Sequence, residues 1–346
     1  MKKYLVYSVF ITLVTLITAE VYLRHKGIYD TFPESIGKRY TTYYNDVFPT
    51  WYFINKPDRD YIPENSDFHY RYHTNSLGLR EKNFSKEKKD SFIRIFVTGD
   101  SFAEGQGAPY DSTWVHLLSR YLAKDGINAE VLNTGVAGSD PVYNYVFHRD
   151  ILKGYKSDYV VVCINYSDFT DYLLRGGLER FHADGTTHYR KGPWYEPFYH
   201  YSYFARGIIE HVGEFPFRGI YASENDFITS TDSAKVCYSA VIDSFVNIAQ
   251  ESKAKIIVVM FSTPIGIRND NNVNRKFRQC FMDIQQQLAK KNIACINIWD
   301  DLKNSLKNKD YLRYSYPNDP HFNPYGYNVM AQVIEHKLIE NNILTR

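Results

Sequence analysis

The pattern of apolar and polar positions separates an irregular region from one in which strands and helices alternate. From about residue 92 onward, short apolar runs of strand length are separated by longer stretches with apolar residues at helical spacing. This alternation predicts a parallel sheet with helices packed against it. The predicted strands are 92–99, 129–135, 158–165, 255–262 and 294–299, and the predicted helices lie near 112–124, 141–153, 233–251, 273–291 and from Pro324 to about Glu340.

Two stretches depart from this alternation. Residues 24–90 are rich in Tyr, Pro, Asn and charge and have little helical period, so we interpret them as a lead-in segment that packs on a main domain, residues 91–346, without a core of its own. Residues from about 170 to 232 are aromatic, contain several glycines and are too long for an ordinary connection. An insertion of this kind is either a lid or binding loop or a peripheral subdomain, and both interpretations stay open.

The N-terminus is apolar enough to enter a membrane. "MKKYLVYSVFITLVTLITAEVYLRHKG" is almost entirely apolar from Tyr4 to Ala19, and continuing to Leu23 reaches the roughly 20 residues that a transmembrane helix needs. A cleavage site after Ala19 would require a small residue where Ile17 stands. We therefore expect residues 1–23 to form an uncleaved signal anchor, in preference to a cleaved signal peptide or a buried helix.

Charges beside the apolar stretch predict its orientation. Lys2 and Lys3 favour a cytoplasmic N-terminus, which leaves the rest of the chain outside the cytoplasm, while Arg24 and Lys26 weaken this signal. The expected location is therefore the cell membrane, with a single pass and the main domain on its periplasmic or extracellular side.

The overall charge and the aromatic content limit the choice of partner. The formal net charge is +2, with basic and acidic residues intermixed, so nothing favours binding to nucleic acid. The chain has 31 Tyr and 22 Phe. Aromatic side chains stack well on sugars, but they are also ordinary core and interface residues.

Cysteine and histidine spacing does not predict a metal site. Cys163, Cys237, Cys280 and Cys295 form no C-x-x-C pair, so buried thiols are favoured, although an oxidising compartment would allow a disulfide between Cys237 and Cys280. Two further histidines in the insertion stand six residues apart in a Gly-Thr-rich loop, which is not the spacing of helical zinc ligands, so we expect no metal there (His182, His188).

A serine follows the first predicted strand. In "RIFVTGDSFAEGQG", residues 94–107, the apolar run leads directly into Gly99, Asp100 and Ser101. Ligands of open parallel sheets bind beyond the carboxyl ends of the strands, where Ser101 would lie. Backbone N–H groups after such a turn can hold an oxyanion. Gly-Asp-Ser is also a common turn, so the serine gains weight only if a base is available.

The candidate base lies near the other end of the chain. In "YPNDPHFNPYGYNVMAQ", residues 316–332, His321 precedes the last predicted helix and Asp319 stands two residues before it. An imidazole that takes the serine proton needs a carboxylate to fix its tautomer and to stabilise its charge. Asp319 and His321 supply both groups on one short loop.

Three blocks of the sequence resemble the SGNH/GDSL hydrolase superfamily. They are "VTGDSFAEGQG", "NTGVAGSD" and "NDPHFNPYGYNVMAQ", in the order in which that superfamily has them, and the upstream "NSLGLRE", residues 75–81, resembles a segment of its membrane-anchored bacterial members. The resemblance covers roughly residues 70–346. It implies a three-layer α/β/α fold with a flavodoxin-like five-stranded parallel sheet.

The resemblance also implies roles for individual residues. Ser101 would be the nucleophile, His321 the general base and Asp319 the triad acid, in the Asp-x-His variant of the last block. The backbone N–H groups of Ser101 and Gly138 would be oxyanion donors. The third block departs from the usual Gly-x-Asn-Asp, because "CINYSDF" places Asn165 in the Gly slot and Ser167 in the Asn slot. Either residue could therefore act as the third oxyanion donor.

These observations predict an extracytoplasmic serine ester hydrolase that forms an acyl-enzyme and acts as a carbohydrate O-acetyl esterase. The chemistry requires neither metal nor organic cofactor. Two alternatives stay open: an O-acyltransferase that acetylates an exported polysaccharide, and a non-catalytic glycan-binding protein on the same fold.

Overall fold

The computed structural model describes residues 2–26, 40–42, 53–63, 65–181, 198, 202–212, 224–268, 271–306 and 310–344. The chain divides into two compact units, of which one contains residues 1–53 and 174–223 and the other contains residues 54–173 and 224–346. Each unit is described by itself. The two histidines of the insertion that were expected not to bind metal, His182 and His188, lie outside the described residues, as does much of the insertion itself.

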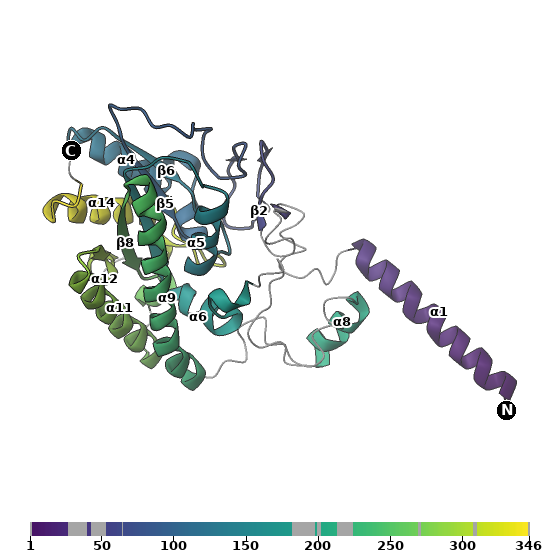
Figure 1. Cartoon of the computed structure of the whole chain (residues 1–346). Helices are drawn as coiled ribbons and strands as arrows, with labels where there is room; N and C mark the ends of the chain where they lie inside the picture. Colours follow the sequence, from purple (N-terminus) through teal and green to yellow (C-terminus); the bar gives the residue numbers. More distant parts are fainter. Residues whose placement is uncertain are drawn as a thin grey trace. The chain divides into compact units, whose positions relative to one another are not determined.

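A five-stranded parallel sheet forms the centre of the larger unit (Figure 1). Its strands lie side by side in the order β6, β5, β7, β8, β9, and every neighbouring pair is parallel. This is the order of flavodoxin-like sheets, so the predicted fold class is confirmed. The strands are β5 (Ile93–Thr98), β6 (Ala129–Asn133), β7 (Tyr159–Asn165), β8 (Lys255–Phe261) and β9 (Ala294–Asn297).

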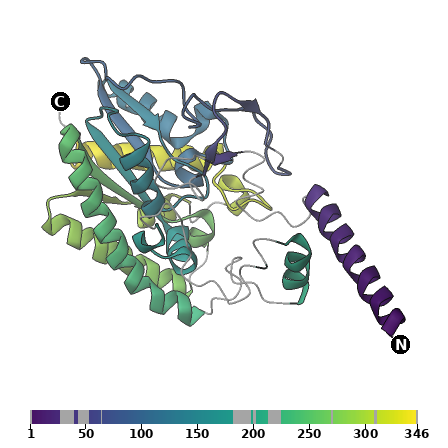
Figure 2. The ribbon, with the colours of Figure 1, turned by 45° about the vertical axis from the view of Figure 1, so that its right-hand side comes forward.

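Helices cover both faces of this sheet (Figures 1 and 2). One face carries α4 (Trp114–Lys124), α12 (Trp299–Leu306) and α14 (Pro324–Glu340), and the other carries α5 (Pro141–Asp150), α9 (Glu224–Ser252) and α11 (Asn272–Lys290). The predicted helix at 233–251 begins earlier, at Glu224, inside the stretch that the sequence indicated as an insertion. Pro324 occupies the first turn of α14, where a missing N–H costs nothing.

The core explains why the strands have continuous apolar sequences. All seven residues of β7 are buried, because this central strand has helices above and below it. On the face of α4 and α14, Val97 of β5 and Val259 of β8 pack in one cluster with Trp114 and Ile334. This packing fixes the carboxyl ends of the strands, where the candidate catalytic residues lie.

The part of the lead-in segment that belongs to the larger unit is well packed. Its strands β3 (Asp60–Tyr61) and β4 (Tyr72–His73) pair antiparallel. Phe68, Tyr70 and Tyr72 form a small buried cluster, and the partly buried Tyr316 from the C-terminal part of the chain packs against it. Outside the five-stranded sheet and its six covering helices, the chain has several further short elements. They are β2 (Phe53–Asn55), α3 (Ser101–Glu104), η1 (Tyr110–Ser112), α6 (Tyr166–Arg175), α10 (Pro264–Arg268) and α13 (Tyr311–Tyr314).

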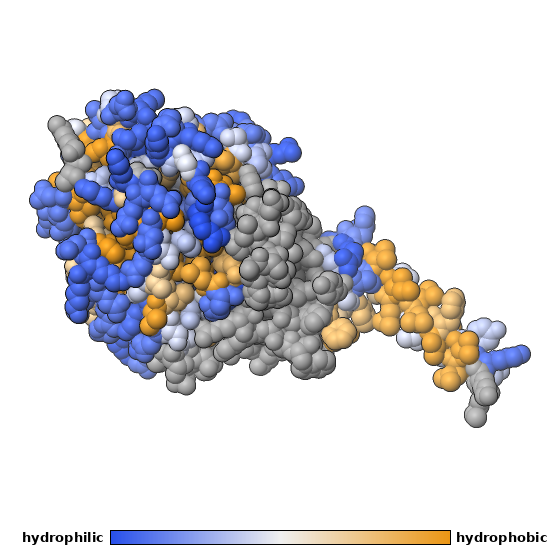
Figure 3. All heavy atoms as spheres, in the orientation of Figure 1, coloured by the Kyte–Doolittle hydropathy of each residue, from blue (hydrophilic) through white to orange (hydrophobic). Residues whose placement is uncertain are grey.

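The smaller unit contains the N-terminal helix α1 (Lys2–Lys26), and with it β1 (Tyr40–Thr42), η2 (Leu178–Arg180) and α8 (Tyr203–Val212). Within the described residues, Lys3–Lys26 is the one segment that is long and apolar enough to cross a membrane. Its large apolar side chains are exposed, as the orange surface of this helix shows (Figure 3). Length and composition alone fit a signal peptide as well as a membrane anchor.

Candidate active site

A tight turn at the end of β5 presents Ser101. Gly99 has no side chain, and a Cβ atom there would lie 2.8 Å from the Cβ atoms of both Ala103 and Cys163. Asp100 is the N-cap of α3, because its carboxylate accepts a hydrogen bond of 2.9 Å from the Phe102 N–H. Ser101 is therefore the first residue of α3, where its own N–H has no acceptor within the helix.

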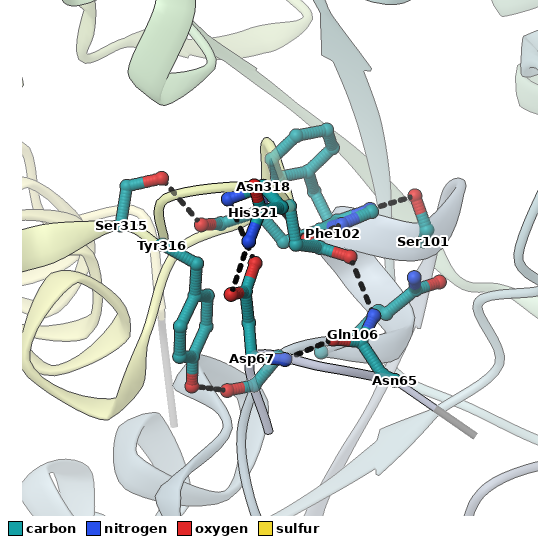
Figure 4. A network of polar contacts seen from close by, with 12 residues as sticks. Asn65, Asp67, Ser101, Phe102, Gln106, Ser315, Tyr316, Asn318 and His321 are labelled. Atoms are coloured by element: carbon teal, nitrogen blue, oxygen red, sulfur yellow. Dashed lines mark hydrogen bonds and ion pairs between the residues drawn. The ribbon is translucent and has the colours of Figure 1, made fainter. Parts of the chain in front are cut away.

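The loop before α14 brings His321 to this serine. His321 Nε2 lies 2.7 Å from Ser101 Oγ, although the two residues are 220 positions apart (Figure 4). On the other side of the ring, His321 Nδ1 lies 2.6 Å from Asp319 Oδ1, which also accepts the His321 backbone N–H at 3.0 Å. The structure thus brings together the three side chains that the sequence indicated, while their roles in catalysis stay a prediction.

Hydrogen-bonding chemistry assigns the direction of these contacts. An ionised carboxylate only accepts, so Nδ1 of His321 carries the proton and donates it to Asp319. Nε2 is then the acceptor, and the Ser101 hydroxyl donates to it. This is the arrangement in which an imidazole can remove a serine proton.

The pKa of Asp319 is consistent with an ionised group. Burial alone would raise this pKa, but the hydrogen bonds and charge of His321, together with a hydrogen bond from Asn65, lower it below its ordinary value. Asp319 and His321 are 9% and 8% exposed, and Phe102 lies against the imidazole with ring centroids 4.7 Å apart. Ser101 itself is half-buried, so a substrate can still reach its hydroxyl.

The loop after β6 lies against the serine turn. The Gly99 carbonyl accepts hydrogen bonds of 2.9 Å from both the Val136 N–H and the Ser139 hydroxyl. Gly138, between these two residues, has a φ of +77°, a conformation that favours glycine. Its expected role as an oxyanion donor together with the Ser101 N–H stays a prediction.

The two candidates for the third oxyanion donor both point toward Asp100. Asn165 Nδ2 and Ser167 Oγ lie 2.9 Å and 3.2 Å from Asp100 Oδ2, and Ser167 Oγ is also 2.6 Å from Asn165 Oδ1. The Ser167 hydroxyl proton is therefore shared between two acceptors of the protein. Asn165 has a second amide proton, so of the two it is better placed to donate further.

A buried pair of carboxylates lies behind the nucleophile, and sequence analysis missed one of its members. Asp168 accepts the Asn165 backbone N–H at 2.6 Å and is 2% exposed. Burial, and then the charge of Asp100, raise the pKa of Asp168 well above its ordinary value. Burial likewise raises the pKa of Asp100, against the hydrogen bonds that it accepts. The spacing of these residues in the sequence gave no signal that they would share one desolvated site.

The four cysteines are free thiols in this structure, with Cys163 and Cys280 buried. Within the described part of the chain, no group of His, Cys, Asp and Glu side chains is arranged to hold a metal ion.

Replacing Asp168 by Asn will change how stability depends on pH. A raised pKa means that the folded protein keeps the Asp168 proton at pH values where the unfolded chain has released it, so this group destabilises the wild type as pH rises above about 4. Asp168→Asn keeps the shape and the acceptor oxygen but removes this effect. We therefore expect the free energy of unfolding of the variant, measured with urea, to rise relative to the wild type between pH 4 and pH 7.

The exposed Asp111→Asn serves as the control for losing one carboxylate. A stability difference between Asp168→Asn and wild type that stays constant over this pH range would contradict the raised pKa.

Comparison with known proteins identifies the family. The GDSL-like Lipase/Acylhydrolase family matches residues 97–329, and no curated protein matches the sequence. The chain is similar to the solved structure of a two-domain esterase active on acetylated mannans (11% identity, TM-score 0.41, 73% of this chain and 50% of that chain covered). It is also similar to an acetyl xylan esterase (17% identity, TM-score 0.44, 71% of this chain and 100% of that chain covered). A third similar structure is a GDSL-like lipase from Bacteroides thetaiotaomicron VPI-5482 (12% identity, TM-score 0.39, 75% of this chain and 93% of that chain covered).

The chain spans half the length of the two-domain esterase. The family match covers most of the chain, includes the segments that carry Ser101, Asp319 and His321, and confirms the resemblance to SGNH/GDSL hydrolases. The chain belongs to the GDSL-like lipase/acylhydrolase family and is a hydrolase of ester bonds.

Proposed function

We propose that the protein is an extracytoplasmic serine esterase that uses Ser101, His321 and Asp319 to remove O-acetyl groups from a carbohydrate. The observation that carries the catalytic part is the continuous chain of contacts from Asp319 Oδ1 to His321 Nδ1, at 2.6 Å, and from His321 Nε2 to Ser101 Oγ, at 2.7 Å.

In the first step, Ser101 Oγ attacks the carbonyl carbon of the ester while its proton moves to His321 Nε2. Asp319 stabilises the resulting imidazolium. The tetrahedral intermediate collapses when the bond to the sugar oxygen breaks, and His321 returns the proton to that oxygen. The products of this step are the free sugar hydroxyl and an acyl-enzyme on Ser101.

In the second step, a water molecule gives a proton to His321 and attacks the acyl carbon. The bond to Ser101 Oγ then breaks, His321 returns the proton to Oγ, and the acid is released. The negative charge on the carbonyl oxygen in both steps needs donors that are in place beforehand. The backbone N–H groups of Ser101 and Gly138 and the side-chain amide of Asn165 are our candidates. Losing one such donor typically lowers the rate about 10²–10³-fold.

Three features of the chain support a carbohydrate O-acetyl ester as the substrate. The family establishes ester chemistry, and an aromatic content of 16% provides rings that can stack on sugars. An N-terminal apolar helix would hold the enzyme at the membrane, beside the polysaccharides of the cell envelope.

Contacts inside the smaller unit support a membrane helix with a polar outer end. Glu20, near the end of α1, accepts the N–H groups of Tyr203 and Phe204 at 3.1 Å and 2.9 Å, at the start of α8. It also accepts a hydrogen bond of 2.9 Å from the Ser202 hydroxyl and pairs with Arg24 at 2.7 Å. Both carboxylate oxygens of Glu20 therefore have hydrogen-bond partners, which supports a position of this side chain at the membrane surface.

Ser101→Ala and His321→Ala will each remove most of the activity, because neither the attack nor the proton transfer has a substitute. We expect kcat/KM for a soluble acetyl ester to fall by about 10⁴-fold or more in each single variant, and the double variant to be scarcely worse. The exposed Ser91→Ala is the matched control and should behave as wild type. Turnover by Ser101→Ala at the wild-type rate would refute the proposed nucleophile.

Substrate assays will separate hydrolysis from acyl transfer. With an O-acetylated oligosaccharide, we expect stoichiometric release of acetate, and with nitrophenyl esters we expect acetyl to be preferred over long acyl chains by at least about tenfold in kcat/KM. If acetyl groups instead appear on an added unacetylated oligosaccharide, the acyl-enzyme reacts with sugar in preference to water, and the protein is an acyltransferase.

The full chain, expressed with a C-terminal tag in a bacterial host, is expected to stay in the membrane fraction and to keep its N-terminal helix. Intact-mass measurement checks the N-terminus, and protease added to spheroplasts should digest the enzyme domain without lysis. A soluble product that begins after Ala19, or a domain protected until lysis, would contradict the proposed anchor or its orientation.

A further inference from the structure

We propose that residues 65–81, here called the strap, position the two catalytic loops, and that Asn65 orients the carboxylate of Asp319. This inference rests on the proposed roles of Ser101, His321 and Asp319. The strap lies outside the family match, which begins at residue 97, and its last residues, 75–81, are the segment that resembles membrane-anchored bacterial members. Neither the family match nor the three blocks that carry the proposed catalytic residues account for what the strap does.

The first contact of the strap is with the proposed triad acid. Asn65 Nδ2 donates to Asp319 Oδ2 at 3.1 Å, while the other oxygen, Oδ1, accepts both hydrogen bonds from His321. Asn65 Oδ1 in turn accepts the Asp67 N–H at 2.8 Å, which fixes the direction in which the amide points. The Asp319 carboxylate is therefore held at both oxygens, and it cannot rotate away from the imidazole without losing a partner.

The second contact secures the neighbouring residue. Asp67 Oδ2 accepts the Asn318 N–H at 2.8 Å, and Asp67 Oδ1 accepts the Asn318 side-chain amide at 3.0 Å (Figure 4). Asn318 stands directly before Asp319. Its two hydrogen bonds to Asp67 therefore tie the chain next to Asp319 to the strap.

The strap also holds the loop that follows the serine. Arg80 is 1% exposed and donates to the carbonyl groups of Gly105 at 2.7 Å and Ala108 at 2.6 Å. Its guanidinium lies 4.9 Å from the ring centroid of Tyr70 and 4.7 Å from that of Tyr72. These contacts supply buried carbonyl groups with donors and place a rigid, planar cation beneath the serine loop.

One glycine links all three segments. The Gly107 N–H donates to the Tyr70 hydroxyl of the strap at 3.0 Å, and the Gly107 carbonyl accepts a hydrogen bond from the Tyr316 hydroxyl, in the segment that leads to His321. Tyr316 also packs on Phe68 of the strap, with ring centroids 5.4 Å apart. The serine loop and the histidine loop are thus each bound to the strap and to each other, which holds Ser101 and His321 at hydrogen-bonding distance.

Variants at Asn65 test this proposal in the full chain. Asn65→Ala removes the donor to Asp319, so we expect kcat for a soluble acetyl ester to fall about tenfold while KM changes less than about twofold, the size expected for one lost hydrogen bond to a charged group. The exposed Asn304→Ala is the matched control. The thermal midpoint of each variant shows whether the fold is retained.

Asn65→Asp gives a readout that a merely structural role would not change. A second negative charge beside Asp319 favours the imidazolium, so the acidic limb of the pH profile of kcat/KM is expected to move to higher pH. The other titratable side chains that face Asp319 and His321 are the same in the variant and in the wild type. They are Asp100, Asp67, Tyr70, Tyr316 and Tyr327.

The outcomes separate this proposal from the proposed function. If both Asn65 variants keep the wild-type kcat and pH profile while Ser101→Ala is inactive, the catalytic assignment stands and the positioning role is wrong. If Asn65→Ala lowers only the thermal midpoint and Asn65→Asp leaves the acidic limb in place, the strap is structural alone. Full activity of Ser101→Ala would overturn the proposed function itself.

Discussion

The hydrogen bond between Ser101 Oγ and His321 Nε2 joins two loops that are 220 positions apart in the sequence. Neither loop has a conformation that could hold this distance by itself. The parallel sheet places the end of β5 between β6 and β7, and α14 packs on α4 and on β9 so that the loop before it returns to the carboxyl edge of the sheet. Packing between these elements therefore helps to keep the Ser101 hydroxyl 2.7 Å from the His321 imidazole.

Three aspartates near this hydrogen bond have different electrostatic surroundings. Asp319 is paired with His321, and its pKa is lowered despite burial. Asp100 and Asp168 are more deeply buried and lie close to each other, and the pKa of each is raised. A negative charge is therefore favoured on the far side of the imidazole, where it stabilises an imidazolium. It is disfavoured directly behind the serine, where it would oppose an oxyanion.

The sequence was sufficient to predict the fold and the three side chains that the structure brings together, Ser101, His321 and Asp319. Strands of a parallel sheet are continuous apolar runs, so their positions could be predicted to within two residues at either end. Ser101 and His321 stand next to clear element boundaries, a strand end and a helix start. The start of α9 at Glu224 was missed, because its first residues lie in a stretch whose aromatic and glycine-rich composition indicated a loop.

The rest of the site could not be predicted, because it consists of contacts between residues that are individually ordinary. Asn65 and Asp67 lie in a polar stretch without period, and only the folded chain shows that they reach Asp319 and Asn318, about 250 positions away. Arg80 is a charged residue of the lead-in segment, and it is buried because carbonyl groups and two tyrosine rings surround it. The oxyanion donors depend on backbone direction, which residue types alone do not specify.

Covalent labelling with a fluorophosphonate tests the central claim most directly, because the reagent forms a bond from an activated serine oxygen to phosphorus as fluoride leaves. Peptide mapping of the labelled protein should find one adduct per chain, on Ser101, and His321→Ala should react at least about 100-fold more slowly. An adduct on another residue, or equally fast labelling of His321→Ala, would contradict the claim that this imidazole activates this serine.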